Sequence, residues 1–174
     1  MSRLSSAADH HSEQECLPAV VEELLADVVA DGFTLYCCGP KVAPNALVAA
    51  YAWDHYVDLL TVQDFHRVIT ARVPTQSPTV DIFDPEVVVW AYEGPPQQAL
   101  GALLGLVHPT HPDAPTGEYP APVGLHVPRA RQRPMTIQPP SPGRAGVRAA
   151  RLAAAVPTHR ADRTRLQRGA RRDT

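Results

Sequence analysis

The chain has 174 residues, of which 44% are hydrophobic and 20% are charged, so it fits one ordinary globular domain with an unusually high count of 19 prolines. The net charge of −2 conceals two oppositely charged segments: residues 1–127 carry a net charge of −12, and residues 128–174, with 12 arginines and two aspartates, carry +10. The absence of a glycine period and of a sustained heptad argues against collagen and a long coiled coil. No apolar run approaches the length of a membrane-spanning helix, about 20 residues.

The first predicted element is an amphipathic helix over about residues 17–30, which follows a polar segment (1–16) that we expect to be disordered. Its apolar positions recur at the spacing of one helix face: Val21, Leu24, Leu25 and Val28. Gly32 is well placed to cap the C-terminal end of this helix.

The next part of the chain favours β-strands. Residues 33–38 have strand composition, and residues 46–53 and 56–62 favour two antiparallel strands joined by a tight turn. A helix over residues 45–60 is the alternative, because 46–53 is apolar on both faces. Residues 67–73 alternate regularly and predict a half-exposed strand.

Residues 86–92 form the most hydrophobic β-type run, so we expect them at the centre of the sheet. A Gly-Pro-Pro sequence at 94–96 then opens a second helix, which should end at His108-Pro109. The predicted fold is therefore α+β: an antiparallel sheet of four to five strands packed with an N-terminal and a C-terminal helix, in a single domain over residues 17–108.

The remaining segment, residues 109–174, is a Pro-rich and then Arg/Ala-rich tail. Ten of the 34 residues from 109 to 142 are proline, and no Phe, Tyr or Trp follows Tyr119. We expect this tail to be largely disordered, and able to fold back on the acidic body. The local exception is residues 144–156, whose alanines and arginines favour a short helix with its arginines on one side.

The basic tail makes nucleic-acid association one candidate function. Arginines bind phosphates in a salt-dependent manner, although the tail offers no aromatic platform on which bases could stack. The residues that would carry this binding are Arg144, Arg148, Arg151, Arg163 and Arg168.

Histidines and aspartates near expected strand and helix ends suggest a second candidate, a metal-dependent hydrolase. Imidazoles and carboxylates are ligands of divalent transition metals, and the candidate ligands are His55, His66, His108 and His111. The competing explanation is structural, because turns favour Asp for backbone hydrogen bonding and no further ligands follow at a recognised spacing.

Other chemistry has little support. Cys37 and Cys38 are adjacent, poorly placed to bond each other and not part of a Cys-x-x-Cys motif, and no apolar signal-peptide segment is visible. We therefore expect a reduced, cytoplasmic protein with buried thiols. No cofactor is predicted, because the chain lacks GxxxxGK[ST] and GxGxxG phosphate-binding motifs.

The leading functional prediction is a small, non-catalytic binding or accessory module whose partner could be another protein. Such a module would use an exposed face or edge of its sheet. Its candidate aromatic anchors are Trp53, Tyr56 and Trp90, although residues of this type more often belong to the core.

Overall fold

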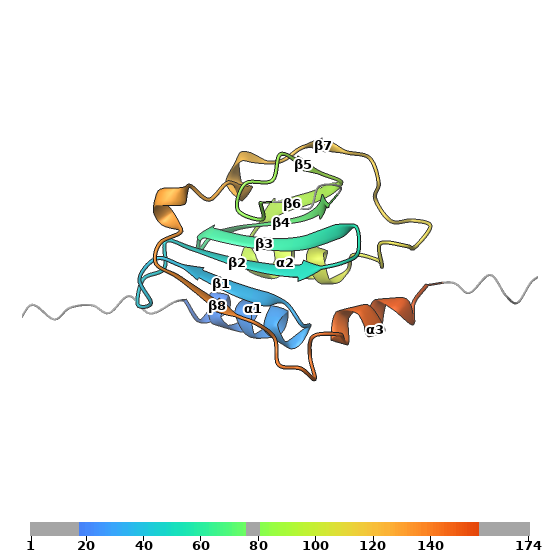
Figure 1. The fold of residues 1–174 in the computed structure, drawn as a ribbon, viewed down its shortest axis with the longest axis horizontal. Coiled ribbons are helices and arrows are strands. Elements are labelled where there is room, and N and C mark those ends of the chain that lie inside the picture. The colour runs from blue at the N-terminus through green and yellow to red at the C-terminus, as the bar shows by residue number, and fades with distance from the viewer. Residues whose placement is uncertain (1–17, 76–80, 157–174) are drawn as a thin grey trace, which may run out of the picture.

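The computed structural model describes residues 18–75 and 81–156, which form an α+β fold (Figure 1). Its main sheet has six antiparallel strands in the order β6-β4-β3-β2-β1-β8. These strands are β1 (Thr34–Cys38), β2 (Ala46–Ala52), β3 (Tyr56–Asp64), β4 (Arg67–Pro74), β6 (Trp90–Gly94) and β8 (Met135–Gln138). A second, two-stranded sheet pairs β5 (Val87–Val88) with β7 (Tyr119–Pro120).

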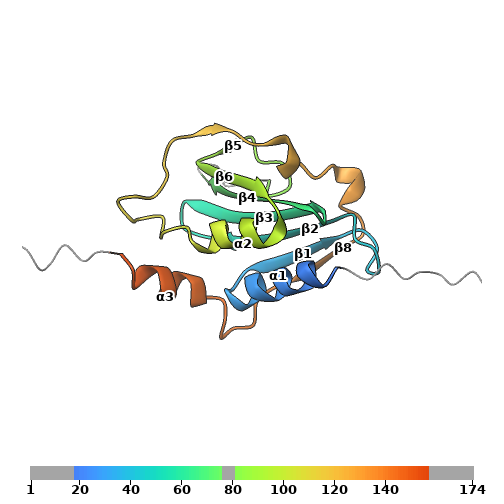
Figure 2. The same cartoon turned by 180° about the vertical axis from the view of Figure 1, so that it is seen from behind.

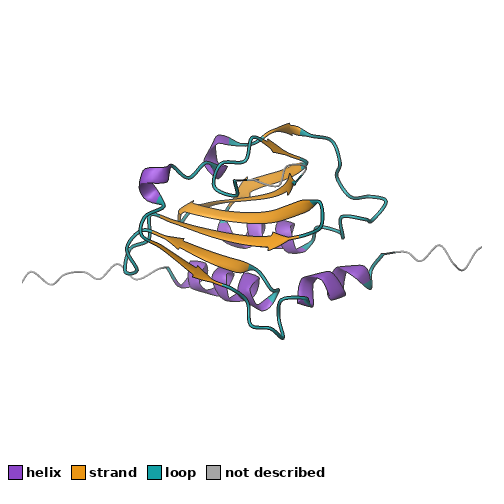
Figure 3. Cartoon of the chain, in the orientation of Figure 1, coloured by secondary structure: helices purple, strands orange, loops and turns teal. Residues whose placement is uncertain are grey.

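Helices α1 (Ala19–Ala30) and α2 (Pro96–Leu104) lie on the same face of the main sheet, as the view from behind shows (Figure 2). Helix α3 (Val147–Ala153) follows β8 at the end of the described chain. Two 3-10 turns, η1 (Val123–Leu125) and η2 (Arg129–Arg131), lie in the long, mostly irregular segment between α2 and β8 (Figure 3). No helix within the described ranges is long and apolar enough to cross a bilayer.

Both faces of the sheet are covered, which gives the protein two cores. On one face α1 and α2 bury Val28, Leu60 and Leu103 together with their neighbours. On the other face the segments around β5, β7 and η1 bury Leu59, Phe83 and Leu125 among others. A strand that is buried on both faces carries a continuous apolar run, and this explains why β2 is apolar at every position.

Several predicted elements are confirmed. The helix expected over residues 17–30 is α1, and Gly32 follows it with a φ of 96°, a conformation that glycine adopts without strain. The hairpin favoured over residues 46–62 is β2 and β3, so the alternative helix over residues 45–60 is wrong.

The strand expected over residues 67–73 is β4, but the expectation that it would be half-exposed is wrong. Only Arg67 is exposed, because the helices cover one face of β4 and the β5–β7 layer covers the other. Alternate side chains of β4 do point to opposite faces of the sheet, but the two faces contact two different cores rather than one core and solvent.

Residues 86–92 do not form a central strand. This run is divided at Val89 into β5, in the small sheet, and β6, at an edge of the main sheet. Val88 and Val89 are buried all the same, and Val88 belongs to the core between the two layers. The second helix also ends earlier than expected, at Leu104 rather than near His108.

The expectation of a largely disordered tail from residue 109 is wrong for the part that is described. The short proline-free run of β8 pairs with β1 as the sixth strand, one more than the sequence predicted. The short helix expected at 144–156 is α3, and its Arg148 is fully buried. The predictions for residues 1–16 and 157–174 lie outside the described residues.

Candidate functional site

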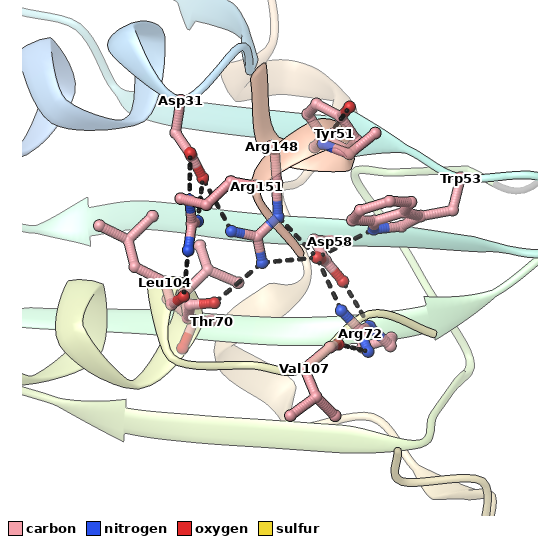
Figure 4. Close-up of polar contacts among 12 residues, drawn as sticks. Asp31, Tyr51, Trp53, Asp58, Thr70, Arg72, Leu104, Val107, Arg148 and Arg151 are labelled. Carbon is pink, nitrogen blue, oxygen red and sulfur yellow. Dashed lines mark hydrogen bonds and ion pairs between the residues drawn. The ribbon is translucent and has the colours of Figure 1, made fainter. Parts of the chain in front are cut away.

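A buried charge network lies between the sheet and the helices, and its centre is Asp58 on β3 (Figure 4). The β3–β4 register places Asp58 directly opposite Arg72. Arg72 donates to the Asp58 carboxylate through Nε at 2.6 Å and Nη2 at 3.0 Å, and its Nη1 donates to the carbonyl of Val107 at 2.9 Å. Trp53 Nε1 donates to the same carboxylate at 3.0 Å.

A second arginine reaches Asp58 from far along the chain. Arg148 on α3 donates to Asp58 Oδ2 through Nε at 3.1 Å and Nη2 at 2.8 Å, and to the carbonyl of Leu103 at 2.9 Å. Its Nη1 donates to Asp31, just after α1, at 2.8 Å. Arg148 therefore ties α3 to the sheet, to α1 and to α2.

The charges of the network are balanced inside the protein. Two buried arginines, Arg72 and Arg148, face two carboxylates, Asp58 and Asp31, of which Asp58 is fully buried and Asp31 is 9% exposed. Arg151, which is partly exposed, adds two hydrogen bonds to Asp31 at 2.9 and 3.2 Å. A buried charge without a partner would cost several kcal/mol, so each member of the network depends on the others.

An aromatic pocket lies beside this network, at the end of the sheet where β2 turns into β3. Its volume is about 380 Å³, and its walls come from the β2–β3 turn, the segment after α2 and Ala149 of α3. Tyr51 and Trp53 pack with their ring centroids 4.8 Å apart, and His108 meets the Trp53 ring edge-on at 4.9 Å. The lining residues are Tyr51, Ala52, Trp53, Asp54, His55, Tyr56, His108, Pro109, Thr110 and Ala149.

The contacts around His108 are local. Its Nδ1 lies 2.8 Å from the hydroxyl of Thr110 and accepts the Thr110 backbone N–H at 3.2 Å. Since both contacts are with a residue two positions away, they form a turn that holds the imidazole against Trp53.

A second hollow of similar volume, about 380 Å³, lies under η1 on the opposite face of the sheet. Its wall includes Thr61, whose buried hydroxyl has no hydrogen-bond partner among the described residues, and Gln63, which donates to the carbonyls of Gly124 and His126 at 3.0 and 2.7 Å. No Phe, Tyr or Trp lines this hollow. Its two acidic residues are matched by two arginines, so the lining indicates a ligand class less clearly than that of the aromatic pocket does.

The aromatic anchors expected from the sequence are divided between two places. Trp53 and Tyr56 line the aromatic pocket, whereas Trp90 lies on edge strand β6, opposite Arg72, and packs against the helix-side core. Tyr51 belongs to the pocket too, but its place within an apolar run gave no sign of that in the sequence.

The four histidines proposed as metal ligands are not brought together. His55 and His108 share the aromatic pocket, but His66 lies at the opposite end of β3. His111 accepts the backbone N–H of Asp113 and is mostly buried. Among the described residues, no group of three or more His, Cys, Asp or Glu side chains is placed to hold a metal ion.

Two aspartates at turns, Asp64 and Asp81, accept local backbone hydrogen bonds, as the structural explanation of the acidic turn residues predicts. Asp64 accepts the N–H of His66 at 2.8 Å, and Asp81 accepts the N–H of Phe83 at 2.9 Å. The acidic residues at these two turns therefore stabilise the turns themselves.

The arginines proposed to bind nucleic acid have other partners where they are described. Arg148 is buried, Arg151 pairs with Asp31, and Arg144 donates to the carbonyl of Ala30 at 3.2 Å. All three thus bind the C-terminal end of α1 or the adjacent core. Arg163 and Arg168 lie outside the described residues.

The two described cysteines are free thiols on β1. Burial raises the pKa of the Cys37 thiol and of the Cys38 thiol above the ordinary value, and the neighbouring Cys37 raises the pKa of Cys38 further. Both effects disfavour the thiolate, which is the reactive form.

The central residues of the network were not predicted as a site. Asp31, Asp58 and Arg72 were visible in the sequence as charged residues next to apolar runs, and a charge within a strand that is buried on both faces requires a partner. That signal could have paired Asp58 with Arg72, since both lie in adjacent predicted strands. It could not have identified Arg148, which is 90 residues from Asp58.

No known protein family matches this chain, and no curated protein or solved structure shows significant similarity to it.

Proposed function

We propose that this protein is a non-catalytic binding module that takes a small organic ligand in the aromatic pocket beside Trp53. The observation that carries this proposal is the pocket itself. Its volume of about 380 Å³ lies near the lower end of the range for small-molecule sites, about 300–1,000 Å³. That space suits a ligand with one or two rings.

The lining indicates the chemistry of the ligand. Tyr51, Trp53 and Tyr56 offer apolar ring surface, and the one acidic or basic residue in the wall besides the two histidines is Asp54, which is exposed. Aromatic faces and a carboxylate together attract organic cations. The ligand class is therefore an aromatic or aliphatic ring that carries an amine.

The network behind the pocket supports a binding role. Trp53 is fixed by its hydrogen bond to Asp58 and by its contacts with Tyr51 and His108, so the pocket wall is formed before a ligand arrives. A preformed wall reduces the entropy lost on binding. A reducing, cytoplasmic location is part of this proposal, and the free thiols of Cys37 and Cys38 support it.

The two alternatives have less support. A metal-dependent hydrolase would need His55, His66, His108 and His111 to converge, but only His55 and His108 share a pocket. Nucleic-acid association would depend mainly on arginines beyond residue 156, since Arg148 is fully buried and Arg144 and Arg151 already have partners in the body of the protein.

Tryptophan fluorescence tests the pocket directly. The chain has two tryptophans, so the full-length Trp90→Phe variant reports on Trp53 alone. We expect 2-phenylethylammonium to give a saturable change in fluorescence and 3-phenylpropanoate, its anionic counterpart, to bind several-fold more weakly.

The matched variants are Asp54→Asn, in the pocket wall, and Glu86→Gln, an exposed residue outside the pocket. Each removes one negative charge, so a general charge effect would weaken amine binding equally in both. We expect loss only in Asp54→Asn. Equal, non-saturable responses to the two probes would overturn the proposal.

A further inference from the structure

We propose that Asp31, Asp58 and the carbonyl of Leu103 form a binding site for an arginine side chain, and that α3 is a tethered ligand of this site. A helical segment of another protein, with the Arg-x-x-Arg spacing of Arg148 and Arg151, competes with α3 for the site. This inference does not depend on what the aromatic pocket binds. It rests on the contacts of Arg148 and on the small size of α3.

The site matches a guanidinium group in detail. A guanidinium carries five N–H donors in one plane, and Arg148 makes four hydrogen bonds, to Asp58, Asp31 and Leu103. The aromatic rings of Phe33 and Trp53 have their centroids 5.2 and 6.0 Å from its central carbon. A lysine ammonium could not reproduce this arrangement of planar donors between aromatic rings.

Helix α3 depends on this site for its place in the fold. It has seven residues, and helices of that length are not stable in water by themselves. Its one large apolar side chain that is buried is Leu152, while Val147 is exposed. Besides Arg148, the helix is held by the bonds of Arg151 to Asp31 and by the Ala149 N–H, which donates to the Tyr51 hydroxyl at 3.2 Å.

The segment that joins β8 to α3 is irregular, as expected for the tether of a ligand. The eight residues 139–146, between β8 and α3, include three prolines and two glycines, and the described part of this connection forms no strand or α-helix. Apolar side chains of similar volume would often attach a helix at least as stably as a buried ion pair. A site built for arginine therefore adds selectivity for the segment that carries it.

Displacement of α3 would also change the aromatic pocket. Ala149 forms part of the pocket wall, and its N–H holds the hydroxyl of Tyr51. A competing segment that carries a different residue at this position would alter one wall of the pocket and leave the sheet intact.

A peptide competition experiment tests the proposal on the full chain. A labelled peptide of residues 144–156 is titrated into wild-type protein and into the Arg148→Ala, Arg151→Ala double variant, in which the tethered ligand is disabled. We expect binding to the double variant to be at least about tenfold tighter, because the tethered α3 competes at a high effective concentration. The control peptide, which carries Arg148→Gln, should lose most of the affinity.

The result that overturns the proposal is equal binding of the two peptides, or no binding to a folded double variant. A second measurement uses the wild-type protein in case the variant does not fold. Hydrogen exchange is measured on a proteolytic fragment that contains both β8 and α3. Because the added peptide lacks β8, this fragment can come only from the protein. An excess of the natural peptide, but not of the Gln peptide, should accelerate exchange in α3, and no acceleration would overturn the proposal.

Discussion

Asp58 and Arg72 face each other across β3 and β4 with two hydrogen bonds of 2.6 and 3.0 Å, and neither side chain is exposed to solvent. The pair lies where the helix-covered face of the sheet meets the segment after α2. Because Arg148 and Trp53 also donate to this carboxylate, a single residue connects two strands, α3 and the wall of the aromatic pocket.

The first prediction concerns Asp58→Asn. The amide keeps the size of the side chain but removes its charge, which leaves the buried Arg72 without a carboxylate partner and Arg148 with Asp31 alone. We expect a loss of about 3–5 kcal/mol in the free energy of unfolding, measured by urea denaturation. Asp54→Asn, on the same hairpin but exposed, is the control and should change the urea midpoint little. Similar midpoints for the two variants would show that the network does not hold the fold.

Local patterns predicted the elements of this fold better than their arrangement. The helical spacing of Val21, Leu24 and Val28 and the apolar composition of residues 46–62 were sufficient for α1 and for the β2–β3 hairpin. They could not show which strand would be central, because hydrophobicity measures burial and not position in the sheet. Val88 and Val89 are buried near an edge of the main sheet, where Val88 packs in the core between the two layers, and nothing local in the sequence distinguishes that from a central strand.

The second prediction concerns Gly124, in the 3-10 turn η1. A Cβ atom added there would overlap Cδ1 of Ile69 on β4, so glycine allows the turn to lie against the sheet. We expect Gly124→Ala to cost about 1 kcal/mol, the low end of the cost of overpacking, because the overlapped atom is the end of a side chain that can rotate. Gly117→Ala, whose Cβ would meet nothing within 4 Å, is the control.

The cause can be isolated in a double variant. Ile69→Val removes the overlapping Cδ1 atom, so Gly124→Ala should cost less in the Ile69→Val background than alone. A double-mutant cycle from urea midpoints measures this coupling. Additive costs would mean that Ile69 is not the reason for the glycine.

The third prediction concerns the thiols of β1. Since burial raises the pKa of Cys37 and of Cys38, both should react slowly with iodoacetamide at pH 7.5. Cys37 is partly exposed and Cys38 is fully buried, so Cys37 should be modified first. A Cys16→Ser background leaves these two thiols as the only ones, and mass spectrometry counts the adducts. Modification as fast as in urea would contradict the prediction.

The raised pKa values of the same thiols should lower the free energy of unfolding as the pH rises. A raised pKa means that the folded state binds the thiol proton more tightly than the unfolded state does. Their contribution to stability is therefore present below the unfolded pKa of about 8.5 and decreases as the pH rises above it. Urea midpoints should fall less between pH 7.5 and 9.5 in Cys38→Ala than in the parent protein.

The candidate site was harder to predict than the fold because its members come from distant parts of the chain. Trp53, Tyr56, His55 and His108 were selected individually, and the structure places these four in one pocket. Asp31 and Arg148 are 117 residues apart, and only the position of α3 brings them together. Proline content predicted little regular structure after α2, but it could not show that one arginine beyond the prolines would enter the core.

The last prediction concerns truncation and corrects where the body of the protein ends. A chain that stops at residue 127, the boundary suggested by charge alone, lacks β8 and Arg148. It leaves the edge of β1 unpaired and the buried carboxylate Asp58 with one arginine fewer, so we expect aggregation or a large drop in the melting temperature. A chain that stops at residue 156 keeps both features and should melt close to the full-length protein.

Comparison of the 1–156 chain with the full-length chain also tests nucleic-acid binding, because six of the 12 tail arginines follow residue 156. If the full-length chain is retained on heparin and the folded 1–156 chain is not, the binding belongs to those six arginines. It should then weaken steeply as the salt concentration rises, as phosphate contacts do. Retention equal to that of the full-length chain would instead exclude them as its main source.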